Sequence, residues 1–265
     1  NDRFANDDSF VANQFDLSGV GLNGRWATMI SENVYVTAKH FAPGVGSSMT
    51  FYAGNDAAGT SVTRVITDTR QQIQGTDIFV GTLDSALPSG FSFYDFATED
   101  INGNPNGSGS FSKSAYNGAN AFVFGRSETN TFSTSQDMAV GRNVLDGFAT
   151  GQTDGVSTGD VVTATDDTGT ANAVTFEAML QTGDSGGPLF VENTSGGLTI
   201  VGVNWFIGTN SAGDDIFGAS YLGNYDGDIQ TFITNNAVPE PSRFALLLSI
   251  ACGSVALRRR GGRLT

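Results

Sequence analysis

Short runs of apolar or alternating residues, separated by turns rich in glycine, asparagine and aspartate, extend along most of the chain. Runs of this length and period predict β-strands. The expected strands are Ala27–Ser31, Val34–Ala38, Ser61–Thr67, Ile78–Leu83, Ala121–Phe124, Val161–Ala164, Ala173–Leu180, Leu189–Val191 and Leu198–Val203. Two segments have helical character: a single turn at Ala38–Phe41, and Asp226–Asn235, where Asp226 is placed to cap the start. The pattern predicts an all-β protein with a short helix near its C-terminal end.

Composition and charge agree with this class and exclude one kind of partner. The 265 residues include 35 glycines but only 6 prolines, and 15% are charged. The net charge of −14 is unevenly distributed, because residues 238–265 carry five Arg and one Glu, a sum of +4 that leaves −18 on residues 1–237. Nucleic-acid binding depends on clustered Lys and Arg, so we expect no nucleic-acid partner.

The last 28 residues, 238–265, differ from the rest of the chain. Pro239-Glu240-Pro241 is followed by an apolar stretch over 244–257 and by the cluster Arg258-Arg259-Arg260. As a helix this stretch is about 21 Å long, shorter than the ~30 Å hydrocarbon core of a bilayer, so we expect transient membrane contact and not a permanent span. The single cysteine, Cys252, also lies here, and residues 1–237 can therefore form no disulfide.

This tail resembles the PEP-CTERM sorting signal of Gram-negative bacteria, in which a Pro-Glu-Pro motif, an apolar helix and an Arg cluster are processed by an exosortase. The resemblance implies an exported protein of the cell envelope, cell surface or extracellular matrix, with an exosortase as a partner of the tail. An N-terminal export signal is then expected to have been removed before Asn1.

Three segments carry candidate catalytic chemistry. The only histidine, His40, ends the run Thr37-Ala38-Lys39-His40, and residues 183–188 read Gly-Asp-Ser-Gly-Gly-Pro. A serine hydroxyl is a weak nucleophile near pH 7 until an imidazole accepts its proton. Asp77 precedes an apolar strand between these segments, and the competing aspartates Asp68 and Asp84 lack that context. The predicted triad is therefore His40, Asp77 and Ser185.

These segments, in this order, resemble those of the chymotrypsin/trypsin-like serine proteases. The resemblance implies two six-stranded antiparallel β-barrels with the active site in the cleft between them and a short C-terminal helix. It assigns residues 1–237 to a protease domain, with a first barrel over about 1–105, a second barrel and helix over about 111–237, and 238–265 as the sorting segment. The polar, glycine-rich stretch 101–110 would connect the barrels.

The same resemblance assigns roles around Ser185. The backbone N–H groups of Gly183 and Ser185 would form the oxyanion hole. In trypsin-like relatives the carboxylate at the position of Asp184 pairs with an N-terminal ammonium freed at an Ile-Val-Gly-Gly sequence, which this chain lacks. Because a buried carboxylate without a partner is strongly disfavoured, Asp184 must find backbone N–H groups, an arginine or solvent.

Substrate-binding residues are expected at Met179, Asn204, Trp205 and Phe206. Met179 stands where trypsin-like enzymes carry an aspartate, which argues against a preference for basic residues. Phe206 is bulky where relatives with deep pockets have glycine. We expect a small or medium apolar residue before the cleaved bond.

The predicted activity is that of a monomeric serine endopeptidase acting on protein or peptide substrates through an acyl-enzyme, without a cofactor or metal. The turn over residues 224–228 could bind calcium but lacks the full spacing of a calcium loop. Two alternatives remain open: a catalytically impaired trypsin-like fold acting as a binding or matrix protein of the bacterial surface, and a structural surface protein in which the Gly-Asp-Ser-Gly-Gly-Pro run occurs by chance.

Overall fold

The structure is a computed structural model that describes residues 1–99, 116–128 and 133–237. The expected linker over 101–110 and the sorting segment over 238–265 lie outside the described residues. Within the described part, no helix is both long and apolar enough to cross a bilayer.

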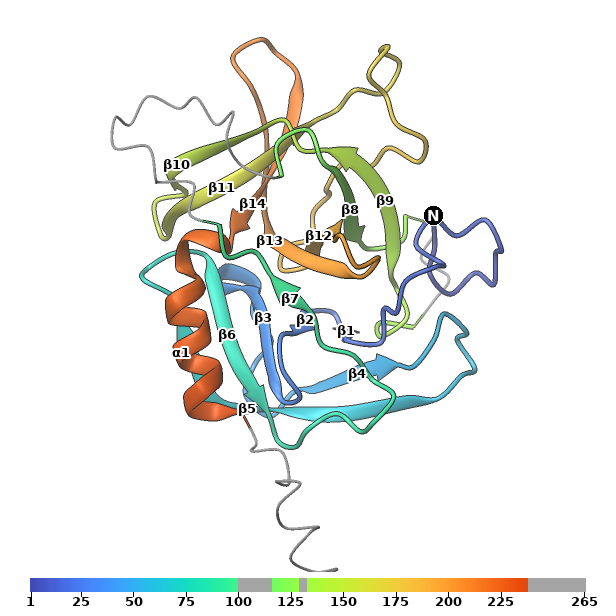
Figure 1. Cartoon of the computed structure of the whole chain (residues 1–265), viewed down its shortest axis with the longest axis vertical. Helices are drawn as coiled ribbons and strands as arrows, with labels where there is room; N and C mark the ends of the chain where they lie inside the picture. Colours follow the sequence, from blue (N-terminus) through green and yellow to red (C-terminus); the bar gives the residue numbers. More distant parts are fainter. Residues whose placement is uncertain (100–115, 129–132, 238–265) are drawn as a thin grey trace, which may run out of the picture.

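The described chain is almost entirely β-structure, which confirms the predicted class (Figure 1). Its strands are β1 (Val20–Leu22), β2 (Trp26–Met29), β3 (Val34–Ala38), β4 (Ser48–Tyr52), β5 (Ser61–Gln72), β6 (Ile78–Leu83), β7 (Asp95–Phe96), β8 (Asn120–Gly125), β9 (Ala139–Val144), β10 (Gly147–Thr153), β11 (Thr158–Thr165), β12 (Pro188–Glu192), β13 (Leu198–Thr209) and β14 (Asp215–Tyr221). The helical segments are the 3₁₀ turns η1 (Lys39–Phe41) and η2 (Gly223–Tyr225) and the helix α1 (Asp226–Asn236).

The first six strands form a closed antiparallel barrel in the order β1-β2-β3-β6-β5-β4, as expected. Strand β3 pairs with β6 over its whole length, from Val34 opposite Thr82 to Ala38 opposite Ile78. Every residue of both strands is buried. The ends of these two strands, which carry His40 and Asp77, are therefore held rigidly side by side.

The later strands form a second sheet ordered β10-β11-β14-β13-β12-β8-β9, with β7 beside β13. The sheet has eight strands where six were expected, and β7 joins β13 in parallel from the segment that follows the first barrel. The chain start also reaches this sheet, because Asp2 bridges to Ala139 of β9.

Several elements differ from the sequence expectation. Residues 173–180 form turns with one bridge, between Glu177 and Arg142, and not the predicted strand. Asp226 is the first residue of α1; the cap position is Tyr225, and no side-chain cap forms there. The calcium-type turn over 224–228 runs through η2 into the start of α1.

Aromatic side chains join the barrel to the second sheet in place of disulfides. Trp26 of β2 meets Phe124 of β8 edge-on with ring centroids 6.5 Å apart, and Phe124 meets Phe190 of β12 at 5.5 Å. All three belong to one buried cluster that draws on both halves of the chain. Because a close-packed interior resists displacement, this cluster fixes how the two halves sit against each other.

Arg3 makes a second connection between the halves. Its side chain is 1% exposed and donates hydrogen bonds to the carbonyls of Tyr52 and Gly54 in the first barrel, at 3.1 Å each. It also contacts the Met138 sulfur, 3.4 Å away, beside the start of β9. Burial lowers the pKa of Arg3 to about 10, so the guanidinium remains charged at neutral pH.

Candidate active site

His40 lies at the point where the barrel interior meets solvent. Strand β3 ends at Ala38, and η1 then turns the chain so that His40 leaves the barrel wall. The imidazole is 35% exposed. A fully buried strand thus presents a partly exposed imidazole in a fixed position.

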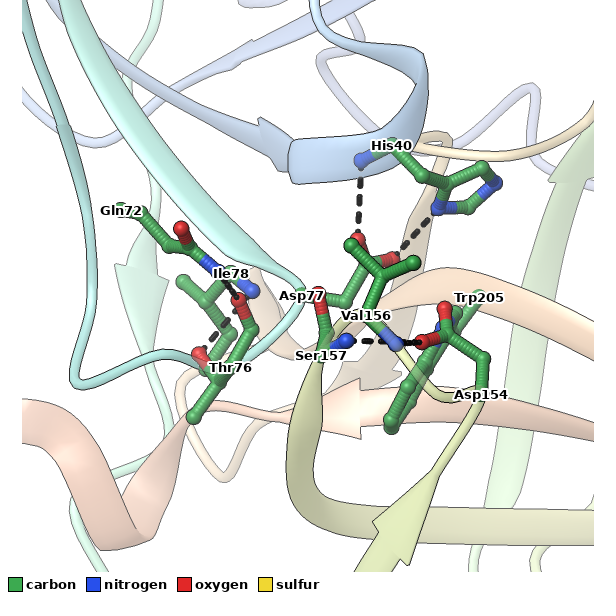
Figure 2. A network of polar contacts seen from close by, with 9 residues as sticks. All are labelled: His40, Gln72, Thr76, Asp77, Ile78, Asp154, Val156, Ser157 and Trp205. Carbon is green, nitrogen blue, oxygen red and sulfur yellow. Dashed lines mark hydrogen bonds and ion pairs between the residues drawn. The ribbon is translucent and has the colours of Figure 1, made fainter.

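Asp77, directly before β6, is completely buried, and both of its carboxylate oxygens contact His40 (Figure 2). Oδ2 lies 2.7 Å from the imidazole Nδ1, and Oδ1 accepts the backbone N–H of His40 at 2.9 Å. The carbonyl of Asp77 accepts the N–H of Lys39 at 2.7 Å. These contacts orient the ring, fix Nδ1 as the protonated nitrogen and turn Nε2 away from Asp77.

The turn before Asp77 is built by its own polar groups. The Thr76 hydroxyl donates to the carbonyl of Ile73 at 2.7 Å. It also accepts the N–H of Ile78 at 3.1 Å, and the Gln72 side-chain amide donates to the carbonyl of Thr76 at 2.8 Å (Figure 2). These bonds hold the backbone on both sides of Asp77.

The competing aspartates lie elsewhere. Asp68 is exposed on β5, and Asp84 is exposed beyond β6, where it accepts the N–H of Val65 at 3.0 Å. Of the three aspartates considered, the structure brings only Asp77 to His40.

A second carboxylate, Asp154, influences His40 from the turn between β10 and β11. Its oxygens accept the N–H groups of Val156 and Ser157 at 2.8 and 2.7 Å and the indole N–H of Trp205 at 3.1 Å (Figure 2). The pKa of His40 is raised, first by its hydrogen bond to Asp77, then by the charges of Asp77 and Asp154, against the opposing effects of burial and of Arg25. The sequence carried no signal for Asp154, because Asp-Gly turns are frequent in this chain.

The serine segment makes a tight turn against the end of β3. Gly183 and Gly186 have φ values of +105° and +85°, a region that glycine enters without strain. A Cβ added to Gly186 would lie 2.4 Å from the Thr37 hydroxyl and 3.1 Å from the backbone nitrogen of Ala38. The residue after Ser185 therefore touches the strand that leads into His40.

Ser185 is half-buried, and its hydroxyl makes no hydrogen bond to another described residue. The backbone N–H groups of Gly183 and Ser185 likewise have no acceptor among the described residues. Two adjacent donors in a rigid turn can bind an anionic oxygen. The predicted oxyanion-hole donors are thus unoccupied beside the predicted nucleophile.

Asp184 is buried and has found backbone partners. Its Oδ1 accepts the N–H of Arg126 at 2.6 Å, and its Oδ2 accepts the N–H of Gln181 at 2.7 Å. Burial raises the pKa of Asp184 to about 6, against the effect of these bonds. A Cβ on Gly125 would collide with this carboxylate at 2.7 Å, so glycine at 125 makes room for it.

The predicted substrate residues have different surroundings. Asn204 is fully buried. Its side-chain amide donates to the carbonyls of Phe124 and Asp184 at 2.7 and 3.2 Å, and its backbone carbonyl accepts the N–H of Gly186 at 2.8 Å. Its side chain supports the serine turn, and the expected role of this strand in substrate binding stays a prediction.

Trp205 lies next to Asn204 and is almost buried, with its indole N–H directed to Asp154. Phe206 covers the neighbouring strand, because a Cβ on Gly218 would lie 2.3 Å from its ring.

Met179 lines a cavity of about 320 Å³. The other residues that line this cavity are Asp166, Leu180, Ile207, Gly208, Thr209, Asp215 and Ile216. Two of these are carboxylates, which the sequence analysis did not anticipate.

No protein-family model and no curated protein matches this chain. Among solved structures, it is similar to the NS6 protease of murine norovirus 1, with 16% identity, a TM-score of 0.45, and coverage of 80% of this chain and 92% of that one. An inactive variant of the murine norovirus NS6 protease, carrying a C-terminal extension, gives 16% identity, a TM-score of 0.45, and coverage of 77% and 92%. Similarity at this level does not assign an activity.

Proposed function

We propose that this chain is a serine endopeptidase that hydrolyses peptide bonds with His40, Asp77 and Ser185. The observation that carries the proposal is the pairing of both oxygens of a completely buried carboxylate with the one histidine of the chain, at 2.7 and 2.9 Å. A buried charge is retained only where it is paired and hydrogen-bonded, and this pair leaves the other ring nitrogen available as a base.

In the proposed reaction the Ser185 Oγ attacks the peptide carbonyl carbon while Nε2 of His40 takes the hydroxyl proton. The carbonyl oxygen becomes an oxyanion held by the N–H groups of Gly183 and Ser185. The C–N bond then breaks, the amine leaves with the proton from His40, and an acyl-serine remains. Water, deprotonated by His40, attacks this ester and releases the acid and the free serine.

The hydroxyl of Ser185 and the imidazole of His40 need to come into hydrogen-bond contact for this step. In unliganded enzymes such contacts are often long and tighten when substrate binds. The close approach of Gly186 to Thr37 and Ala38 keeps the serine turn against the strand that leads into His40.

A second candidate is a binding or matrix protein that keeps this fold without catalysis. The bulk of Phe206, whose ring lies against Gly218, favours it, because a large side chain at the expected specificity position would limit substrate entry. For either candidate we propose delivery to the surface of a Gram-negative bacterium through the tail over 238–265, with exosortase processing and transient membrane contact through 244–257.

The test is labelling with a fluorophosphonate, which reacts with activated serines. Residues 1–237 of the wild type are expected to be labelled, and Ser185→Ala is expected to remain unlabelled. A folded wild type that resists the probe would overturn the protease and leave the binding protein.

The acid limb of activity is expected to lie above the ordinary histidine pKa of about 6.5, because His40 has to be neutral and its pKa is raised. Asp154→Asn keeps an acceptor for Trp205 but removes a charge, so the midpoint of log kcat/KM against pH should move down. Asp68→Asn, exposed on β5, should leave it in place. A midpoint that Asp154→Asn does not move would exclude an influence of this carboxylate on the base.

The raised pKa also affects stability. Protonated His40 is favoured in the folded state. Its contribution to the free energy of unfolding is therefore complete below the pKa of His40 in the unfolded chain, and it disappears as pH rises through the pKa of His40 in the folded state.

The Phe206 ring is expected to restrict the residue before the cleaved bond to small side chains. Phe206→Gly should raise kcat/KM for a phenylalanine or leucine substrate relative to an alanine substrate, by about 10–100-fold. Phe93→Ala removes an exposed phenylalanine elsewhere and should leave the ratio unchanged. The set of substrates includes one with lysine before the cleaved bond, because Asp166 and Asp215 line the cavity beside Met179. If Phe206→Gly leaves the ratio of kcat/KM for large over small substrates unchanged, the specificity pocket lies elsewhere.

A further inference from the structure

The loop over 181–185, which contains the predicted oxyanion donors and which we call the oxyanion loop, is bonded at two points to Arg126, the residue that directly follows β8. The backbone N–H of Arg126 donates to Asp184 at 2.6 Å, and the backbone carbonyl of Arg126 accepts the Gln181 side-chain amide at 3.1 Å. Both bonds run from a strand end to the loop. They fix the loop without any group from a chain terminus.

The side chain of Arg126 is fixed separately by Asp137. The carboxylate of Asp137 is 1% exposed and accepts from Nε and Nη2 of Arg126 at 2.7 and 2.5 Å, while its other oxygen accepts the N–H of Ser127 at 2.9 Å. A guanidinium paired through two nitrogens keeps one orientation. Arg126 is therefore a rigid cation, although a third of its side chain is exposed.

The fixed side chain lies across Gly183. A Cβ built on Gly183 would lie 3.2 Å from Cδ of Arg126 and 3.6 Å from its Nη1. The indole N–H of Trp26 donates to the carbonyl of Gly183 at 3.4 Å. Gly183, whose N–H is one predicted oxyanion donor, thus lies against an arginine side chain and is bonded through its carbonyl to a buried tryptophan.

We propose that Arg126 is the positioning residue of the oxyanion loop: its backbone holds Gln181 and Asp184, and its guanidinium places a fixed positive charge beside Gly183. The inference rests on the proposed protease function. A preoriented charge near a developing oxyanion stabilises the transition state more than the ground state, so the effect should appear in kcat and not in KM.

The charge of Arg126 also acts on Asp184. Arg126 opposes the rise that burial causes in the pKa of Asp184. A protonated Asp184 would turn one oxygen into a donor facing a backbone N–H, and one of its two loop bonds would be lost. Removing the guanidinium should therefore loosen the loop at a higher pH than in the wild type.

The test compares Arg126→Met, Arg126→Lys and Arg64→Met, the last as a matched, half-buried arginine on β5 in the other half. Activity is normalised to active sites counted by fluorophosphonate. We expect Arg126→Met to lower kcat about 10–100-fold with little change in KM, Arg126→Lys to recover part of the loss, and Arg64→Met to match wild type. An unchanged kcat per active site in Arg126→Met would overturn the charge effect.

If Arg126→Met does not fold, Asp137→Asn takes its place. This variant frees the guanidinium of Arg126 and should lower kcat in the same way. An unchanged kcat in Asp137→Asn would overturn the proposal.

A second measurement reads the loop without catalysis. The chain has two tryptophans, so in a Trp205→Phe background the fluorescence of Trp26 reports on Gly183. The pH midpoint of the change in Trp26 fluorescence should be higher in Arg126→Met than in the protein that keeps Arg126. If the wild type hydrolyses nothing and Arg126→Met still titrates at a higher pH than the wild type, the protease is refuted and the positioning role is retained. An identical titration in both proteins would refute the positioning role.

Discussion

Replacing His40 with alanine is expected to lower kcat about 10⁶-fold, and adding Ser185→Ala to that variant is expected to lower it no further. The reason is that the imidazole and the hydroxyl act as one unit: without the base the hydroxyl is not a nucleophile, and without the hydroxyl the base has no proton to take. Initial rates on a peptide substrate measure His40→Ala, Ser185→Ala and the double variant.

Lys39→Ala is the matched control, since Lys39 neighbours His40 and its ammonium lies over the Phe79 ring, 5.4 Å from the ring centroid. It should retain activity within about twofold. Losses that multiply in the double variant would show that the two residues act independently, which the proposed mechanism forbids.

Asp77→Asn is expected to lower kcat about 10⁴-fold while the fold persists. An asparagine side chain has only one acceptor oxygen, whereas Asp77 accepts from both Nδ1 and the backbone N–H of His40. The amide N–H₂ would favour the tautomer protonated at Nε2, which points a proton and not a lone pair at Ser185. The raised pKa of His40 should also fall, because Asp77 is its main cause.

Asp84→Asn provides the control for this substitution, because Asp84 is a surface aspartate that accepts one backbone N–H. Its kcat should equal that of wild type, and thermal unfolding of both variants checks that they are folded. A loss of less than tenfold in Asp77→Asn would mean that another group orients the imidazole.

Local sequence context identified the parts of the site that lie on regular or strongly constrained backbone. Asp77 directly precedes an apolar strand, and the glycines at 183 and 186 occupy positions where the backbone has positive φ. Such requirements act within a few residues, so the chain itself displays them. The β3 and β6 strands were predictable for the same reason, since every position in them is buried.

The parts that were missed depend on distant partners. Arg126 and Asp154 lie in short loops, and their importance comes from residues 58 and 51 positions away in the contacts to Asp184 and Trp205. Residues 173–180 alternate like a strand, yet Phe176 adopts a φ of +62° there and the segment turns. Strands β9, β10 and β14 escaped notice because glycine, asparagine and aspartate interrupt their apolar pattern.

The buried guanidinium of Arg3 makes the stability of the first barrel depend on a residue outside its strands. Without this side chain the carbonyls of Tyr52 and Gly54 would lose their bonds to it, at a cost of about 1–3 kcal/mol for a buried carbonyl such as that of Tyr52.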